Sequence, residues 1–341
     1  MATDTWIGPT KGTSNFWQDP ANWSKGVPVQ SSDVAITAAG TYTVLITAAE
    51  HPYQIKSLTL GGTGPSARLI DSGSLSVIGA ANLTHGIFDV QAGGTGSVLG
   101  NLTLSGSSQA LDEGVFNIAG TLGGTAGTVM IDGGSMFAGT VAGSDRFAIS
   151  LDGTLEVGGG ISATTGIAFA DSGADALVLD SPGTALNAAI TGFGGDNSID
   201  IGSLAFSSQY TTQYSGTTLT ISNAGKAVFT ITNINNPGSF ALADDDSGGT
   251  VLMVCYARGT MAATPAGEVP VESLQPATAA SSPMPEWTAR CIRTRSAEPT
   301  SGPGRRAPAC PSPPTRRPSG RSGSAWPSVP LRSGDGPGSQ R

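Results

Sequence analysis

One cysteine stands in a context that could support nucleophilic chemistry. Cys255 is the only cysteine among the first 290 residues, and it follows the apolar run Val251–Val254. A thiolate is a strong nucleophile when its surroundings lower its pKa. A cysteine at this place is therefore either a reacting group or a small apolar residue at the end of a strand. The other two, Cys291 and Cys310, leave an odd total that gives no paired disulfide framework.

The residues that follow Cys255 resemble the first block of Hint domains, the self-processing fold of hedgehog proteins and inteins. The shared features are the leading Cys255, Gly259-Thr260, Thr264-x-x-Gly267 and Val271-x-x-Leu274. The resemblance implies that Cys255 attacks the carbonyl of Val254 and shifts the acyl group from nitrogen to sulfur. It also implies supporting roles for Thr260 and Thr264.

The segment departs from the Hint pattern in ways that bear on its activity. No histidine follows His85, so the histidine that protonates the departing amide in this family is missing. After Leu274 the chain continues Gln275-Pro276, where the family has Gly-Asp. We therefore interpret residues 251–276 as the inactive start of a Hint domain. Active processing between Val254 and Cys255, and an ordinary buried strand cysteine, are the alternatives.

Several acidic residues lie close together in the sequence and could form catalytic pairs. They are Asp112-Glu113, Asp171 with Asp175, Asp196 with Asp200, and Asp244-Asp245-Asp246. Glycoside hydrolysis needs two carboxylates facing one cleft, and polysaccharide lysis needs a base that removes a proton. No Lys, Arg or His clusters with these pairs in the sequence, so we interpret them as solvated turn residues.

The sequence gives only a weak indication of metal binding. The run Gly192–Asp200 has the composition of calcium-binding glycine-aspartate turns, but one copy cannot build a site from neighbouring turns. Asp196, Asp200 and Asp244 are the candidate ligands. The sequence predicts no metal site and no cofactor.

Residues 41–250 must position any such group, and their pattern is that of short strands. Apolar and polar residues alternate with a period of two, and Gly, Asn, Asp and Ser mark the turns. Many short strands without an aromatic-rich core favour a right-handed parallel β-helix, a solenoid, over stacked sandwiches. The predicted strands include 42–46, 55–60, 74–78, 87–90, 98–104, 115–118, 129–132, 147–151, 155–157, 177–180, 199–201, 218–221 and 228–231.

Residues 1–40 are predicted to cap this solenoid. They contain three of the five tryptophans, Trp6, Trp17 and Trp23. Terminal repeats of stacked folds need capping, so an aromatic plug is expected, with a carbohydrate-stacking platform as the alternative. The pattern of these aromatics, followed by a strand, resembles the opening of bacterial surface proteins of the autotransporter-passenger type.

Charge divides the chain into two parts. Residues 1–276 carry 7 Lys or Arg and 22 Asp or Glu, whereas residues 277–341 carry 10 Arg and 3 acidic residues. The acidic body argues against nucleic-acid binding by the main fold. The Arg/Pro-rich tail, residues 277–341, is predicted to be disordered, and its composition is typical of a frameshifted reading of GC-rich DNA.

These patterns together predict a secreted or cell-surface β-solenoid that carries an inactive Hint start. The alternatives are a structural or adhesive passenger without processing and a β-helical polysaccharide-active enzyme. Carbohydrate or other surface ligands are the expected partners. The N-terminus has no basic and apolar signal-peptide regions, and no apolar run is long enough to span a bilayer, so export by a non-classical route is expected.

Overall fold

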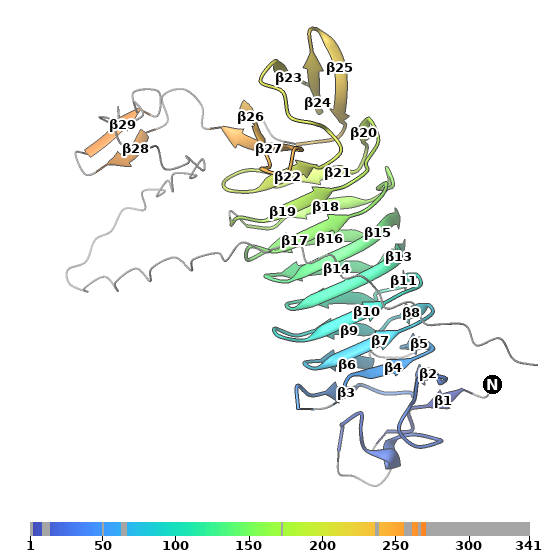
Figure 1. Cartoon of the computed structure of the whole chain (residues 1–341). Helices are drawn as coiled ribbons and strands as arrows, with labels where there is room; N and C mark the ends of the chain where they lie inside the picture. Colours follow the sequence, from blue (N-terminus) through green and yellow to red (C-terminus); the bar gives the residue numbers. More distant parts are fainter. Residues whose placement is uncertain are drawn as a thin grey trace, which may run out of the picture. The chain divides into compact units, whose positions relative to one another are not determined.

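The computed structural model describes residues 3–8, 14–49, 51–62, 67–171, 173–235, 239–255, 261–264 and 267–270 (Figure 1). The chain divides into two units, Met1–Thr294 and Arg295–Arg341, and every described residue belongs to the first unit. The tail predicted from residue 277 onward lies outside the described residues.

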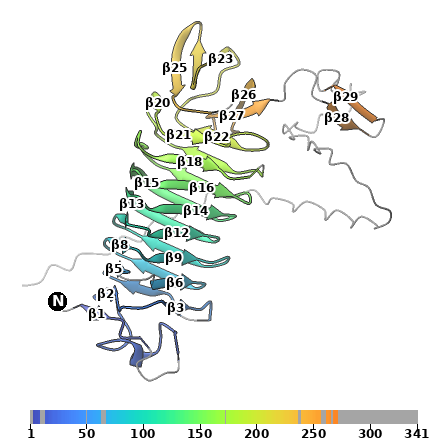
Figure 2. The ribbon, with the colours of Figure 1, turned by 180° about the vertical axis from the view of Figure 1, so that it is seen from behind.

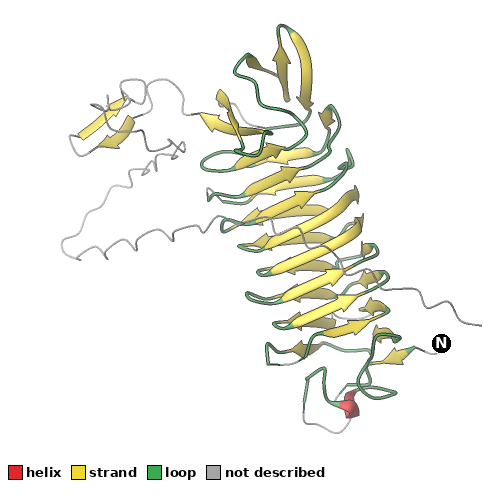
Figure 3. Ribbon diagram, viewed as in Figure 1, coloured by secondary structure: helices red, strands yellow, loops and turns green. Residues whose placement is uncertain are grey.

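Strands make up almost all of the described secondary structure, as Figure 3 shows. The helical element among the described residues is η1 (Pro20–Asn22), a short 3₁₀ turn near the N-terminus. Its first turn is capped by Asp19, whose carboxylate accepts a hydrogen bond from Ala21 N at 3.0 Å. The prediction of an all-β fold is confirmed.

The strands stack in parallel to form the three faces of a solenoid. Face 1 contains β1 (Asp4–Thr5), β2 (Asp33–Ile36), β5 (Ser57–Leu60), β8 (Ala81–Thr84), β11 (Leu102–Ser105) and the second halves of β13 (Val115–Thr125) and β15 (Ser135–Gly143). Because β13 and β15 turn the corner without a break, they also contribute their first halves to face 3.

Face 2 contributes one strand to each turn, and its eight strands indicate about eight turns (Figure 2). Its strands are β3 (Tyr42–Ile46), β6 (Ala67–Asp71), β9 (Ile87–Val90), β12 (Gln109–Asp112), β14 (Thr128–Asp132), β16 (Arg146–Ser150), β18 (Gly166–Phe169) and β21 (Ala189–Thr191). The predicted parallel solenoid is therefore confirmed.

Face 3 completes each turn. Besides the first halves of β13 and β15, it contains β4 (Tyr53–Ile55), β7 (Ser74–Val77), β10 (Thr95–Val98), β17 (Thr154–Val157), β19 (Ala176–Leu179) and β22 (Ser198–Ile201). Turn length varies along the solenoid: register partners are 18 residues apart at Val129 and Phe147, and 25 apart at Val44 and Leu69.

Inward-facing side chains fill the space between the three faces. On face 3, register partners form one buried column of Leu75, Gly96, Phe116, Met136, Leu155, Leu177 and Ile199. The ring of Phe116 contacts that of Phe88 on face 2, with centroids 4.9 Å apart. Gly96 leaves space for Val90 and for the ring of Phe116, because a Cβ there would lie 2.8 Å from Val90 Cγ2 and 3.1 Å from Phe116 Cδ2. Shape complementarity between turns therefore adds to the hydrophobic stabilisation.

The N-terminal end of the solenoid is covered by an aromatic cap. Trp6, Trp17 and Trp23 are at most 3% exposed, and Trp23 contacts both other rings with centroids 4.8–5.0 Å apart. Trp23 Nε1 donates to the carbonyl of Trp17 at 2.7 Å, and Trp17 N donates to Leu45 O on β3. The predicted cap is confirmed, and these buried rings cannot serve as a platform for a sugar.

The other end of the solenoid is covered by antiparallel strands. The strand β27 (Thr250–Cys255) pairs with β22, and β26 (Ser239–Asp244) pairs with β27. A second sheet contains β20 (Ala185–Leu186), β23 (Tyr210–Ser215), β24 (Thr218–Asn223) and β25 (Lys226–Ile231). Beyond them, β28 (Met261–Thr264) and β29 (Gly267–Pro270) form a hairpin. We refer to residues 202–255 as the C-terminal cap.

Candidate functional site

Cys255 is the last residue of β27 and therefore belongs to the C-terminal cap. On one side of β27, Val254 and Cys255 are opposite Phe240 and Ser239 of β26. On the other side, Thr250 to Met253 pair with β22, so the segment is an inner strand that extends face 3. The side chain of Cys255 lies outside the described part of the chain. The structure thus places the predicted nucleophile by its backbone only.

The structure also describes the two threonines predicted to assist Cys255 only in part. Thr260 lies outside the described residues. Thr264 is the last residue of β28 and is opposite Gly267 of β29, but its side chain is outside the described set. The proposed group of Cys255, Thr260 and Thr264 therefore stays a prediction.

The candidate metal ligands do not converge on one point. Asp196 lies in the turn before β22, Asp200 faces outward on β22, and Asp244 ends β26 with its carboxylate accepting from Asp246 N at 3.0 Å. Among the residues that the structure describes, no group of three or more His, Cys, Asp or Glu could hold a metal ion.

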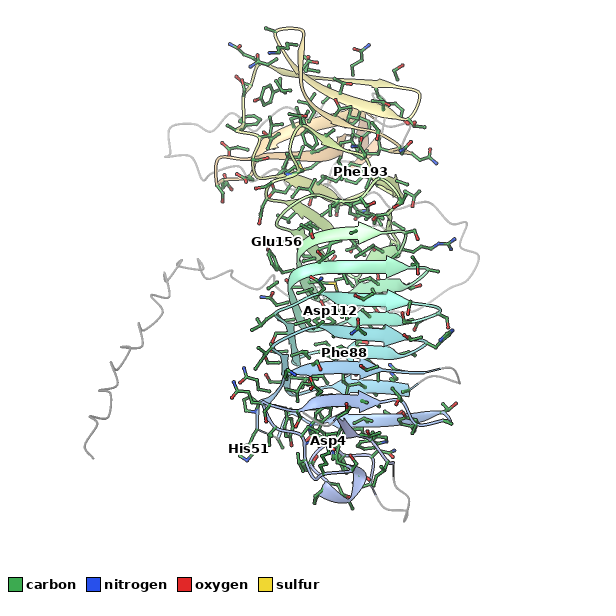
Figure 4. All side chains as sticks on the ribbon, turned by 90° about the vertical axis from the view of Figure 1, so that its right-hand side faces the viewer. Asp4, His51, Phe88, Asp112, Glu156 and Phe193 are labelled. Carbon is green, nitrogen blue, oxygen red and sulfur yellow. The ribbon has the colours of Figure 1, made fainter. Side chains whose placement is uncertain are left out.

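A group of acidic residues does gather where face 3 meets the C-terminal cap. Glu156 on β17 and Asp200 on β22 are separated by β19, so about two strand spacings, roughly 10 Å, lie between their Cα atoms. Desolvation and the charges of Asp245 and Asp180 raise the pKa of Asp200 to about 6. Desolvation and the charge of Asp180 also raise the pKa of Glu156, which is labelled in Figure 4.

Asp200 in this group keeps its proton up to about pH 6, but the group lacks the basic residue that a lyase reaction needs. A lyase needs a basic residue beside the carboxylates. Among the described residues, no lysine or arginine contributes to the pKa shifts of Glu156 or Asp200. The polysaccharide-active alternative therefore gains no support from this group, and the mutual repulsion of the carboxylates is its main consequence.

Asp175 lies at the corner between face 2 and face 3. In the turn before it, this corner position is Gly153, where a Cβ would lie 2.7 Å from Ile131 O. In the turn after it, the equivalent residue is Asn197. The Asp175 carboxylate accepts from Gly153 N at 3.2 Å, and the Asn197 carbonyl accepts from Asp175 N at 3.3 Å. Each side chain therefore satisfies a backbone donor in the turn before it.

Asp171 and Asp175 have opposite pKa shifts although they are neighbours. The carboxylate of Asp171 accepts from Leu151 N at 2.9 Å and from Gly173 N at 2.8 Å, which lowers its pKa. Burial, together with the charge and hydrogen bond of Asp171, raises the pKa of Asp175 to about 6. Asp171 is thus the ionised partner, and the pair takes up one further proton below about pH 6.

Two of the acids predicted to be solvated are in fact fully buried, so that interpretation was wrong for them. Asp112 and Asp175 are both 0% exposed. Asp112 ends β12 in an inward column between Val90 and Ile131, and Figure 4 labels it on the solenoid. Both residues lie at the corner between face 2 and face 3, where their side chains face the interior of the solenoid, and this position accounts for the burial.

The C-terminal cap also contains a small pocket that sequence reasoning missed. It has a volume of about 140 Å³ and is lined by Phe206, Ser207, Ser208, Tyr210, Thr212, Phe240 and Leu242. These residues come from the loop before β23, from β23 itself and from β26. The only signal in the sequence was the presence of aromatic residues, Phe206 and Tyr210, near the end of the strand region. Their partner on β26, Phe240, is about 30 residues away, so the sequence did not indicate that they form one pocket.

Comparison of the chain with protein-family models, with curated proteins and with solved structures found no significant match. Among the described residues, no helix has the length and apolar character needed to cross a bilayer. The fold and its own surfaces therefore carry the functional argument.

Proposed function

We propose that this chain is a secreted or cell-surface β-solenoid scaffold that displays ligand-binding loops and does not process itself. The observation that carries the proposal is a continuous parallel solenoid of about eight turns whose two ends are covered by caps. Each inner strand pairs on both sides, and its inward side chains are buried. The body is a rigid support, so recognition falls to loops and caps.

The caps support this role physically. An open strand at the end of a solenoid is a template for pairing with another chain. Here β1 and the Phe16–Leu45 bridge cover the first turn, and β27 and the Ile190–Ile234 bridge cover the last. Covered ends favour separate rods over fibres, which suits a displayed binding protein.

Surface display is tested in the cells that produce the full chain. Intact cells are treated with proteinase K, and the chain is followed with an antibody raised against the purified protein. We expect its signal to disappear before that of an internal marker protein. If the chain survives until the cells are lysed, the proposal of surface exposure is wrong.

The position of Cys255 supports the view that its Hint-like segment is vestigial. An N-to-S acyl shift requires the thiol to approach the Val254 carbonyl from outside the plane of its peptide. Val254 is paired with Phe240 inside the β26–β27 ladder, which holds this peptide extended. The pairing favours a structural cysteine in the C-terminal cap.

Self-processing is tested by incubating the full chain with a thiol and weighing it by intact mass spectrometry. Wild type and Cys255→Ala are compared, with Ser239→Ala, on the opposing strand, as the matched control. We expect one full-length mass in all three samples. A fragment ending at Val254 in wild type and Ser239→Ala, but not in Cys255→Ala, would show that processing survives.

A further inference from the structure

Hydrogen bonds fix the loop that forms the pocket in the C-terminal cap. We call it the cap pocket, defined by Phe206, Ser207, Ser208, Tyr210, Thr212, Phe240 and Leu242. Thr250 Oγ1 donates to Leu204 O at 2.7 Å, Phe206 N donates to Gly248 O at 3.3 Å, and Tyr210 Oη donates to Ala205 O at 2.9 Å. These bonds pin the pocket's loop to both neighbouring segments, so little ordering is needed on binding.

One wall of the cap pocket is an aromatic ring that is fixed from behind. Phe240 stacks on Phe193, with centroids 6.4 Å apart and planes 11° apart, and it contacts Tyr214 at 5.7 Å. Tyr214 is held in turn by the hydrogen bond from its hydroxyl to Ile234 O at 3.0 Å. Phe193, labelled in Figure 4, is 3% exposed and anchors this group to the solenoid core. Phe240 therefore presents a supported ring edge or face to the pocket.

Besides Tyr210 and Leu242, the remaining lining residues are three that carry aliphatic hydroxyls and the exposed Phe206. Ser208 and Thr212 each offer one donor and two acceptor positions, whereas Ser207 Oγ already accepts from Gln209 N at 3.3 Å and keeps its donor and one acceptor position. Phe206 is 36% exposed beside them. A pyranose ring matches this combination, because its C–H face is attracted to the negative face of an aromatic ring while its hydroxyls exchange hydrogen bonds with the rim.

The size of the pocket and the charge around it limit the ligands that it can bind. About 140 Å³ is well below the roughly 300–1,000 Å³ of pockets that bury a drug-sized ligand, so one sugar ring is the suitable occupant. The acidic run Asp244–Asp246 follows Leu242 on β26, and Gly248 contacts the pocket loop. The negative charges of this run repel an anionic sugar, so the pocket favours a neutral one.

We propose that the cap pocket binds the terminal pyranose ring of a neutral glycan. This inference rests on the proposed function, since a displayed scaffold meets glycans outside the cell. Phe206 and Phe240 contact the ring's C–H face, and Ser207, Ser208 and Thr212 exchange hydrogen bonds with its hydroxyls. The acidic run excludes uronic acids and other anionic sugars.

Saturation-transfer difference NMR on the full chain tests this directly. The probes are methyl β-glucopyranoside, methyl β-galactopyranoside and N-acetylglucosamine, with glucuronic acid as the anionic counter-probe. At least one neutral sugar should give signals from its ring C–H protons, and glucuronic acid should give none at neutral pH. Phe206→Ala should weaken binding by ~10-fold or more, which corresponds to about 1.4 kcal/mol.

Two further variants keep the test specific. Thr212→Val keeps the shape of the side chain but removes the hydroxyl, and it should weaken the binding of the same sugar. Phe16→Ala is the matched control, because Phe16 lies in the N-terminal cap and is 39% exposed against 36% for Phe206. It should leave binding unchanged.

The outcomes separate the pocket from the display function. No signal from any neutral sugar, equal binding of glucuronic acid, or signals that survive in both Phe206→Ala and Thr212→Val would each overturn the cap-pocket proposal. None of these results touches surface display, which the protease experiment on intact cells decides separately.

Discussion

Replacing Asp112 with asparagine should stabilise the solenoid at neutral pH. Asp112 is 0% exposed, and one of its carboxylate oxygens accepts from Gly114 N at 3.1 Å. The other oxygen has no hydrogen-bond partner among the described residues. Burial, opposed in part by the Gly114 bond, raises its pKa from 3.8 to about 6. Asparagine keeps the shape and the accepting oxygen and removes the buried charge, while its amide NH2 takes the place of the unpartnered oxygen and offsets part of the gain.

The magnitude follows from linkage. Because the folded state binds the Asp112 proton more tightly than the unfolded state, stability falls as the pH rises from about 3.8 through about 6. A shift of about two units corresponds to ~3 kcal/mol once the pH is above 6. We therefore expect Asp112→Asn to gain up to ~3 kcal/mol at pH 7.5 and nothing below pH ~3.8, where Asp112 is protonated in both states.

Urea denaturation at pH 3.5, 5 and 7.5, followed by circular dichroism, measures this effect. Asp171→Asn is the matched control of opposite sign, because hydrogen bonds from Leu151 N and Gly173 N lower the pKa of Asp171. Its ionised form stabilises the fold above pH ~3.8, and that contribution is lost as the pH falls through the lowered pKa. Asp171→Asn should therefore lose stability at pH 7.5. The reasoning is refuted if Asp112→Asn is less stable than wild type at pH 7.5 or gains equally at all three pH values.

Two further substitutions test the packing of the solenoid. Gly96→Ala places a Cβ 2.8 Å from Val90 Cγ2 and should cost about 1–3 kcal/mol in urea denaturation, whereas Gly166→Ala, with no heavy atom within 4 Å of its Cβ, should cost less than half of that. Arg68→Met leaves the carboxylate of Asp89, which is 0% exposed, without its charged partner and should cost about 1–3 kcal/mol, reduced because the Arg68 side chain is 41% exposed. The double variant Arg68→Met with Asp89→Asn should recover most of this loss, and failure to recover it would show that the pair itself is not what stabilises face 2.

Local patterns were sufficient to predict the fold class. The alternation of apolar and polar residues in segments such as 42–46, 87–90 and 129–132 corresponds to β3, β9 and β14, in which the inward positions are buried. Each such segment needs a partner for its apolar face, and short strands joined by glycine turns stack to provide one. The three tryptophans of residues 1–40 were likewise sufficient to predict a cap.

Corners were harder to predict because they depend on contacts between turns. Residues 98–104 were predicted as one strand, but the structure divides them between β10 and β11. Gly100 lies at this corner, where a Cβ would be 2.6 Å from Gly79 O in the turn before. A single sequence window contains no sign of that neighbour, about twenty residues away.

The candidate site was hidden for the same reason. The cap pocket joins Phe206 and Tyr210 to Phe240, which are far apart in the sequence and meet only because β26 pairs with β27 at the end of face 3. The burial of Asp112 was missed because an Asp-Glu pair at a turn is usually solvated, and only the stacking of β12 between β9 and β14 turns it inward.

The most direct test of the central claim is hydrogen–deuterium exchange of β27 in the full chain. If Val251–Cys255 is a strand of the solenoid's C-terminal cap, the amides of this segment that bond to β22 and β26 should be as strongly protected as those of β22 itself. Exchange of Val251–Cys255 within seconds, while β22 stays protected, would contradict the account. It would mean that the segment ending at Cys255 is not a fixed strand of the C-terminal cap, which removes the structural reason against self-processing.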